Sequence, residues 1–168
     1  MSVTINFKSN FVKKKSENLV LFFDDNFDTT TLKKYISGKE YSYISDLIVI
    51  SDKKNKIISY DISSKKKIVL ISIKNDLKIS DVESLGAEFY GRINYGKNSE
   101  YFINSDSIIS KEINFLGHFL HGLKLKSYEF NKYKSKKETR TISINIIGVK
   151  NKISTQKISR FNALEEGT

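Results

Sequence analysis

The most regular hydrophobic pattern in the chain lies in residues 107–128. Its large apolar side chains recur at intervals of three and four residues, at Ile109, Ile113, Leu116, Leu120 and Leu123. Residues at these intervals lie on one side of an α-helix, so the pattern predicts an amphipathic helix with a broad buried face. At 1.5 Å per residue this helix would be roughly 33 Å long, enough to cross the sheet of a small domain.

Runs of apolar residues elsewhere in the chain predict six strands. Alternation of apolar and polar residues, which is typical of strands with one buried face, occurs at 3–7, 58–62 and 142–146. Residues 19–23 and 68–73 are apolar almost throughout, which indicates strands buried on both faces. We expect 68–73 at the centre of the sheet, and a sixth, short strand at 101–103.

Shorter helices are predicted between these strands. They cover residues 32–36, 44–48 and 82–93. For residues 44–48 both a helix and a strand remain possible, because residues 48–50 are all β-branched. At the start of the third, Ser80 and Glu83 have the spacing of a capping box, in which each side chain bonds to the other residue's backbone N–H.

The order of these elements predicts the fold class. From residue 68 onward strands and helices alternate, which is the order that builds a parallel sheet through right-handed crossovers. The first half of the chain supplies further strands, some of which can be antiparallel. We therefore predict an α/β fold with a mixed, largely parallel sheet of about six strands and helices on both faces.

Composition narrows the class of protein. The chain has 168 residues, which suits one domain, and it has no cysteine, which excludes disulfides and thiolate metal ligands. Residues 1–7 do not have the pattern of a signal peptide, and no apolar run reaches the length of about 18 residues that a membrane helix requires. We therefore expect a cytoplasmic protein that does not bind membranes.

The net charge of +10 suggests a polyanionic partner such as nucleic acid. However, only three of the 29 basic residues are arginine, the residue that contacts bases and phosphates through two hydrogen bonds at once. Lysine, isoleucine and asparagine are abundant and proline is absent, a bias that AT-rich codons also produce. We therefore favour a compositional origin of the charge.

A stretch rich in lysine and aromatic residues lies at 124–137, with six lysines and one acidic residue. This mixture is typical of surfaces that bind single-stranded nucleic acid by neutralising phosphates and stacking on bases. The candidate residues for that role are Lys132, Lys134, Lys136, Lys137 and Phe130. We favour the alternative, in which the aromatic residues anchor the end of the helix on the sheet and the lysines stay in solvent.

Other candidate sites have a simpler structural interpretation. His118 and His121 are three residues apart on the long helix, a spacing that suits two metal ligands, but the sequence offers no third ligand. Asp24, Asp25 and Asp28 could hold a cation, but the threonines that follow them favour a turn and a helix cap. The chain lacks the common hydrolase and nucleotide-binding motifs. We assign no catalytic, metal-binding or cofactor-binding residue.

The region after the long apolar stripe resembles a known family. The pattern G-x-x-L-x-x-Y-x-F-x-x-Y-K is formed by Gly122, Leu125, Tyr128, Phe130, Tyr133 and Lys134. Strand-like residues 141–149 and an E-G pair at 166–167 follow it. This order is similar to the end of the amino-terminal domain of bacterial leucyl (cytosol) aminopeptidases of the M17 type. His121 departs from the family pattern, in which a small or acidic residue is expected.

The resemblance implies a macro-domain-like α/β domain over residues 1–150. It also implies the start of a linker helix over 151–168, leading toward a catalytic domain that is absent. In that family the catalytic domain holds two divalent metals, zinc or manganese, and forms the hexamer, so this piece alone would be a monomer. The family's catalytic segment contains N-T-D-A-E-G-R, which does not occur here, so no catalytic residue is carried over.

Three functions follow, in order of preference. The first is the non-catalytic amino-terminal domain of a leucyl aminopeptidase, which cleaves amino-terminal residues from peptides; this domain would contribute to assembly or access. The second is a basic nucleic-acid-binding module. The third is a macro-like nucleotide- or phosphate-binding domain. It is disfavoured because phosphate-binding loops need closely spaced glycines, and no two of the eight glycines fall within three residues of each other.

Overall fold

Six strands form one mixed sheet in the computed structural model, which describes residues 2–7, 18–24, 30–51, 54–63, 66–74, 77–93, 100–108, 114–132 and 141–147. The strands are β1 (Ser2–Phe7), β2 (Asn18–Asp24), β3 (Ile57–Asp61), β4 (Lys67–Ile73), β5 (Glu100–Asn104) and β6 (Thr141–Ile147). Their order across the sheet is β1-β6-β5-β2-β4-β3, and every neighbouring pair is parallel except β3 and β4. The predicted α/β class and largely parallel sheet are confirmed.

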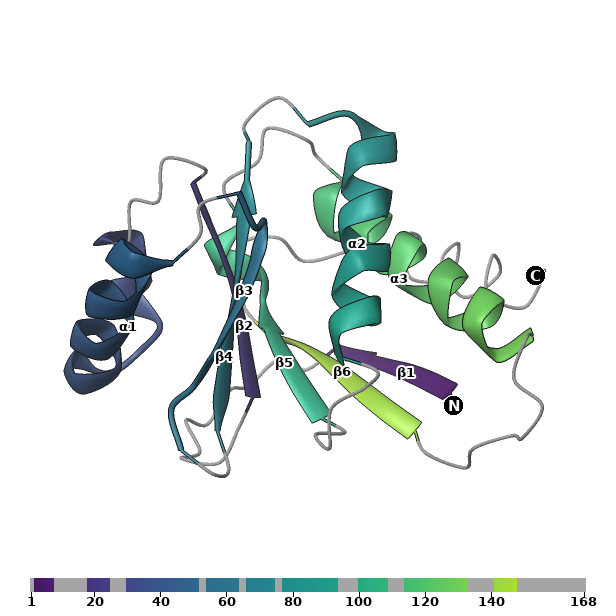
Figure 1. Ribbon diagram of the computed structural model, residues 1–168. Coiled ribbons are helices and arrows are strands. Elements are labelled where there is room, and N and C mark those ends of the chain that lie inside the picture. Colours follow the sequence, from purple (N-terminus) through teal and green to yellow (C-terminus); the bar gives the residue numbers. More distant parts are fainter. Residues whose placement is uncertain are drawn as a thin grey trace.

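Helices cover both faces of the sheet, as predicted. They are α1 (Gly38–Ile50), α2 (Ile79–Ile93) and α3 (Phe115–Lys132), with the short 3-10 helices η1 (Thr30–Lys34) and η2 (Ser105–Ser107). Figure 1 shows α1 on one face, beside β3, β4 and β2, and α2 with α3 on the other. None of the described helices is long and apolar enough to cross a membrane.

Strand β2 lies between two hydrophobic cores. Val20 and Phe22 belong to the core under α2 and α3, whereas Leu19, Leu21 and Phe23 belong to the core under α1. All five side chains are buried. Because successive side chains of a strand point to opposite faces, an unbroken apolar run requires cover on both sides, as the sequence predicted.

Phe22 is the centre of an aromatic cluster beneath α3. Its ring centroid lies 5.4 Å from those of both Phe115 and Phe119, with the rings edge to face. Phe89 of α2 lies 5.6 Å from Phe119. Aromatic pairs of this kind contribute roughly 0.5–1.5 kcal/mol beyond their buried area, so the cluster helps to fix where both helices cross the sheet.

Two glycines allow α2 and α3 to pack closely. A Cβ atom on Gly86 of α2 would lie 1.9 Å from the backbone oxygen of Phe119, and one on Gly122 of α3 would lie 1.9 Å from that of Glu83. Each glycine therefore packs directly against the backbone of the opposite helix. No larger residue fits at either position unless the helices separate.

The start of α3 differs from its prediction. The helix begins at Phe115 rather than near residue 107, although Leu120 is buried on it as expected. The chain before it forms η2, and the Ile108 N–H donates to the Ser105 carbonyl at 3.2 Å. Ile108 is therefore buried outside the helix, and apolar spacing alone did not mark this boundary. Two residues of the predicted stripe, Ile109 and Ile113, lie outside the described residues.

The capping box predicted for Ser80 and Glu83 is wrong. Helix α2 begins at Ile79, two residues earlier than that arrangement requires, because a cap at Ser80 would make Asp81 the first helical residue. The Asp81 carboxylate accepts a hydrogen bond from the backbone N–H of Lys78 at 3.3 Å and supports the first turn. Ser80 therefore lies inside the helix, and Glu83 is free to contact α3.

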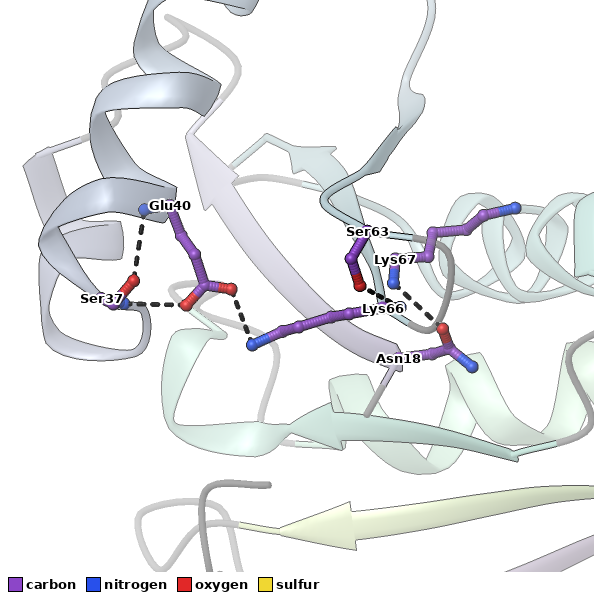
Figure 2. A network of polar contacts seen from close by, with 6 residues as sticks. All are labelled: Asn18, Ser37, Glu40, Ser63, Lys66 and Lys67. Atoms are coloured by element: carbon purple, nitrogen blue, oxygen red, sulfur yellow. Dashed lines mark hydrogen bonds and ion pairs between the residues drawn. The ribbon is translucent and has the colours of Figure 1, made fainter. Parts of the chain in front are cut away.

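A complete capping box begins α1 instead. The Ser37 hydroxyl accepts from the Glu40 N–H at 3.2 Å, and the Glu40 carboxylate accepts from the Ser37 N–H at 3.1 Å. Figure 2 shows both bonds. The helical interpretation of residues 44–48 is confirmed, and the strand alternative for 48–50 is wrong. An N-terminal cap and the buried pair Ile44 and Ile48 outweigh the β-branched residues at the end.

Strand β4 does not occupy the centre of the sheet, where its apolar sequence placed it. β5 and β2 hold the two central positions, and β4 lies between β2 and the edge strand β3. It is still buried on both faces, because Leu70 packs in the core under α1 and Ile71 in the core under α2 and α3. A strand that is apolar throughout is therefore one that helices cover on both faces, and it need not lie at the centre of the sheet.

Candidate functional site

The sheet has a topological switch point between β2 and β5. The chain passes from β2 to β4 on one side, and then returns from β4 to β5 on the other side of β2. In open α/β sheets, ligands bind at such a point, beyond the carboxyl ends of the strands. The carboxyl ends of β2 and β5 are therefore the candidate functional site that the topology indicates.

Two serines of η2 occupy the position where β2 and β5 separate. The strands share only three residue pairs. Beyond them, the Ser107 hydroxyl accepts from the Phe22 N–H at 3.0 Å and donates to the Asn104 carbonyl at 2.7 Å. The Ser105 hydroxyl donates to the Ile147 carbonyl of β6 at 2.8 Å. These buried hydroxyl groups satisfy backbone groups at the strand ends, so their role is structural.

Tyr35 and Asp106 lie at the rim of the same site. The Tyr35 hydroxyl donates to the backbone carbonyl of Asp106 at 2.9 Å. Burial, and then the negative charge of Asp106, raise the pKa of the Tyr35 phenol above its ordinary value. The phenol therefore stays protonated near neutral pH and acts as a hydrogen-bond donor, not as a base.

The aspartates considered as a cation site do not form a described metal centre. Asp24 ends β2 and is half-buried, whereas Asp25 and Asp28 lie outside the described residues. Within the described part of the chain, no three His, Asp or Glu side chains come together in a way that could hold a metal ion. The predicted role of Asp28 as a helix cap stays a prediction.

His121 of the predicted histidine pair contacts another helix. Its Nδ1 lies 3.1 Å from Oε1 of Glu83 on α2, and about a third of each side chain is exposed. His118 is half-buried on the same helix. The sequence did not reveal this contact, because Glu83 precedes His121 by 38 residues and only the packing of α2 on α3 brings them together.

The basic aromatic stretch is only partly described. Lys132 is the last residue of α3, but its side chain and that of Phe130 lie outside the described set, as do residues Lys134, Lys136 and Lys137. Lys124, at the start of the stretch, is buried, and its ammonium group donates to the Val3 carbonyl of β1. The expectation that the lysines stay in solvent is therefore wrong for Lys124, which ties α3 to β1.

The described glycines do not form a phosphate-binding loop. Gly38, Gly86, Gly91, Gly117 and Gly122 all lie within helices. Gly86 and Gly122 serve the contact between α2 and α3, and no described glycine lies at the carboxyl ends of β2 or β5. In the described part of the chain, the switch point therefore lacks the close backbone approach that a nucleotide phosphate requires.

Comparison with known proteins gives similarities of structure and none of sequence. No protein-family model matches the chain, and no curated protein sequence matches it. A point mutant of tomato leucine aminopeptidase is similar with a TM-score of 0.68 and 15% identity, over 99% of this chain and 36% of that chain. The cytosol aminopeptidase of Coxiella burnetii gives 0.53 and 15% identity, over 95% of this chain and 31% of that chain.

This chain has the fold of the amino-terminal region of leucine aminopeptidases. It spans about a third of the length of the two aminopeptidases. The macrodomain of Thermus aquaticus DarG is also similar, with a TM-score of 0.52 and 11% identity, over 87% of this chain and 99% of that chain. The expected macro-domain-like fold is thus confirmed. The match spans 99% of the macrodomain chain, so in that structure the shared fold makes up nearly the whole chain.

Proposed function

We propose that this chain is the amino-terminal, non-catalytic domain of a leucyl aminopeptidase that holds two divalent metals. The observation that supports this proposal best is the similarity to tomato leucine aminopeptidase over 99% of this chain. The motif that begins at Gly122 points to the same family from the sequence alone. In this proposal residues 1–150 form the domain, and 151–168 begin the linker toward the catalytic domain.

The proposed role is to shape assembly or access, and not to perform the cleavage. The Ser105 and Ser107 hydroxyl groups at the switch point are bonded to the backbone, and no cluster of His, Asp or Glu that could hold a metal accompanies them among the described residues. The catalytic domain would hold the two metals, zinc or manganese, which activate water for attack on the peptide bond. The domain described here would remain a rigid α/β body, joined to the catalytic domain through the linker.

The proposal also gives an assembly and a location. The full-length protein would be a cytoplasmic hexamer held by its catalytic domains, and this domain alone would be a monomer. Light scattering on the purified domain measures this directly, and we expect the mass of one chain. A stable trimer or hexamer of the domain alone would contradict the proposed division of roles.

The decisive experiment is to read the gene beyond the codon for Thr168. We expect the reading frame to continue into a segment with a two-metal aminopeptidase motif. A stop codon at that place would overturn the proposal, because no catalytic domain would follow this one. As a second test, the purified domain should hydrolyse no aminoacyl p-nitroanilide with or without Mn²⁺ or Zn²⁺, and metal-dependent turnover by it would overturn the non-catalytic role.

A further inference from the structure

Strand β3 is an open edge of the sheet. It pairs with β4 on one side, and the described residues place no strand on its other side. The Ser72 N–H donates to the Lys56 carbonyl and the Ile62 N–H donates to the Lys66 carbonyl, which continue the antiparallel register between β3 and β4. Even-numbered residues of β3 therefore bond toward β4.

The backbone groups of the odd-numbered residues point the other way. In an antiparallel pair the N–H and C=O of successive residues alternate between the partner strand and the outside. Ile57, Ser59 and Asp61 consequently direct their backbone N–H and C=O groups away from β4. Ile57 is buried, whereas Ser59 and Asp61 are exposed at the open edge. The two donors and two acceptors of Ser59 and Asp61, at strand spacing, are a template for one further strand.

An exposed apolar stripe lies on α1, the helix that contacts the hairpin of β3 and β4 through Glu40 and Ser51. Tyr43, Leu47 and Ile50 are four and three residues apart and share one flank of the helix. Tyr43 is 48% exposed and Ile50 is 80% exposed, while Leu47 packs partly against the core under α1. Apolar side chains that share one flank of a helix and stay exposed form a candidate contact surface.

Polar contacts hold both ends of α1 against the hairpin of β3 and β4. At its first turn, the Glu40 carboxylate lies 2.7 Å from the ammonium group of Lys66, which follows the turn of that hairpin (Figure 2). At its C-terminal cap, the Ser51 hydroxyl lies 2.7 Å from the Tyr60 hydroxyl of β3. The helix therefore lies beside the hairpin of β3 and β4, as Figure 1 also shows.

We propose that β3 and the Tyr43–Leu47–Ile50 stripe of α1 together bind an extended acidic polypeptide segment, which adds to the sheet as a seventh strand next to β3. The backbone of the segment would bond to Ser59 and Asp61. Its apolar side chains on one face would rest on the α1 stripe. An edge strand and an adjacent apolar helix are the two elements that peptide recognition by strand addition requires.

Charge identifies the kind of segment. The chain carries a net charge of +10, and Lys54 and Lys56 are exposed where the chain enters β3. Two described acids of this region lie near a lysine: Glu40 is 2.7 Å from the Lys66 ammonium group, and Asp61 is 3.9 Å from that of Lys67. Asp46 is exposed on α1. A second copy of this basic chain would be repelled, whereas an acidic segment would be attracted. The inference does not depend on the proposed aminopeptidase role.

The experiment uses the wild-type domain and three synthetic peptides. The parent peptide has about eight residues, the length of a strand, with alternating valine and glutamate. One derivative carries N-methyl groups on all valines and the other on all glutamates, so each blocks hydrogen bonds along one edge of the extended peptide. We expect the parent and one derivative to bind, and the other derivative to lose binding by about tenfold or more in titration calorimetry.

Two variants of the domain place the peptide on β3 and α1. Ser59→Pro removes one outward N–H, and proline is tolerated where an edge strand faces solvent, so the fold should persist in circular dichroism. We expect this variant to bind the parent peptide about tenfold more weakly, while Ser59→Ala binds like wild type. Ile50→Ser removes exposed apolar surface and should also weaken binding, by about tenfold.

Three outcomes would overturn the proposal. The first is absence of binding by the parent peptide, and the second is equal binding of both methylated derivatives, which would indicate attraction by charge alone. The third is dimerisation of the wild-type domain that Ser59→Pro abolishes in light scattering, because the occupant of the edge would then be a second copy. The peptide comparison needs no variant, so it stands even if Ser59→Pro unfolds.

Discussion

Glu40 and Lys66 join the first turn of α1 to the turn between β3 and β4, with the carboxylate and ammonium groups 2.7 Å apart. Burial alone would raise the pKa of the Glu40 carboxyl, but hydrogen bonds from Lys66 and Ser37 and the charge of Lys66 lower it below the ordinary value of 4.5. A carboxyl whose pKa is lower in the folded state stabilises the fold above its ordinary pKa. This contribution is lost as the pH falls below 4.5 toward the folded pKa.

The first prediction follows from this contact. Glu40→Gln keeps a side chain that can complete the capping box but removes the charge, so it should lower the free energy of unfolding at pH 7 by about 0.5 kcal/mol. Glu40→Ala also removes the cap and should cost about 1 kcal/mol. Urea unfolding at several pH values measures the free energy of unfolding of both variants. The difference in this free energy between Glu40→Gln and wild type should shrink below pH 4.5. A difference that is independent of pH would rule out the ion pair as its source.

The second prediction concerns the close contact between α2 and α3. Gly122→Ala should destabilise the domain by about 1–3 kcal/mol or more, because its Cβ would overlap the backbone of Glu83 and the helices would have to separate. Gly117→Ala on the same helix is the matched control, since nothing lies within 4 Å of its Cβ. The control should gain about 0.5–1 kcal/mol from helix propensity. Thermal unfolding should thus shift in opposite directions, and equal shifts would refute the close approach.

The third prediction concerns the buried face of α3. Leu120 is fully buried, so Leu120→Ala should cost about 2–5 kcal/mol through lost packing and a cavity. Leu125, on the same helix, is 40% exposed, and Leu125→Ala should cost well under half as much. Chemical denaturation of the two variants gives the comparison. Similar losses would mean that α3 presents a different face to the sheet.

Local patterns in the sequence predicted the strands well, and contacts between distant residues explain what they missed. The apolar run at residues 19–23 identified a strand buried on both faces because alternation is absent wherever both faces need apolar cover. The start of α3 was misplaced because Ile108 continues the helical spacing, although a hydrogen bond to Ser105 puts it in a turn. The approach of Gly122 to Glu83 depends on two helices whose packing no local pattern specifies.

The candidate site was less predictable than the fold for the same reason. The sequence offered lysines near the end of α3 as a uniform basic surface, but Lys124 points inward and donates to Val3, which is 121 residues away in the chain. Its burial follows from the position of β1 beside β6, a parallel pairing between the two ends of the chain. Charge counts along the sequence cannot distinguish such a lysine from one in solvent.

The last prediction separates a selected nucleic-acid site from a compositional charge. If Lys132, Lys134, Lys136 and Lys137 bound phosphates, their joint replacement by glutamine would remove about three to four units from the slope of log affinity against log salt concentration, since each phosphate contributes roughly 0.7–0.9. We expect instead that this slope changes little, and by the same amount as in a control variant in which four exposed lysines elsewhere are replaced by glutamine. The control replaces Lys34, Lys39, Lys74 and Lys78.

Both quadruple variants lose the same net charge, so a difference between them in fluorescence titrations with single-stranded DNA reports the place of binding and not the total charge.

Phe130→Ala adds an independent measure. In a stacking site it would cost about 1–3 kcal/mol of binding and leave the melting temperature unchanged, whereas an anchoring aromatic would lower the melting temperature instead. We expect the lower melting temperature, because Phe130 belongs to the motif shared with aminopeptidases. If the slope of log affinity against log salt concentration changes only when Lys132, Lys134, Lys136 and Lys137 are replaced, and not in the control, nucleic-acid binding becomes the preferred function.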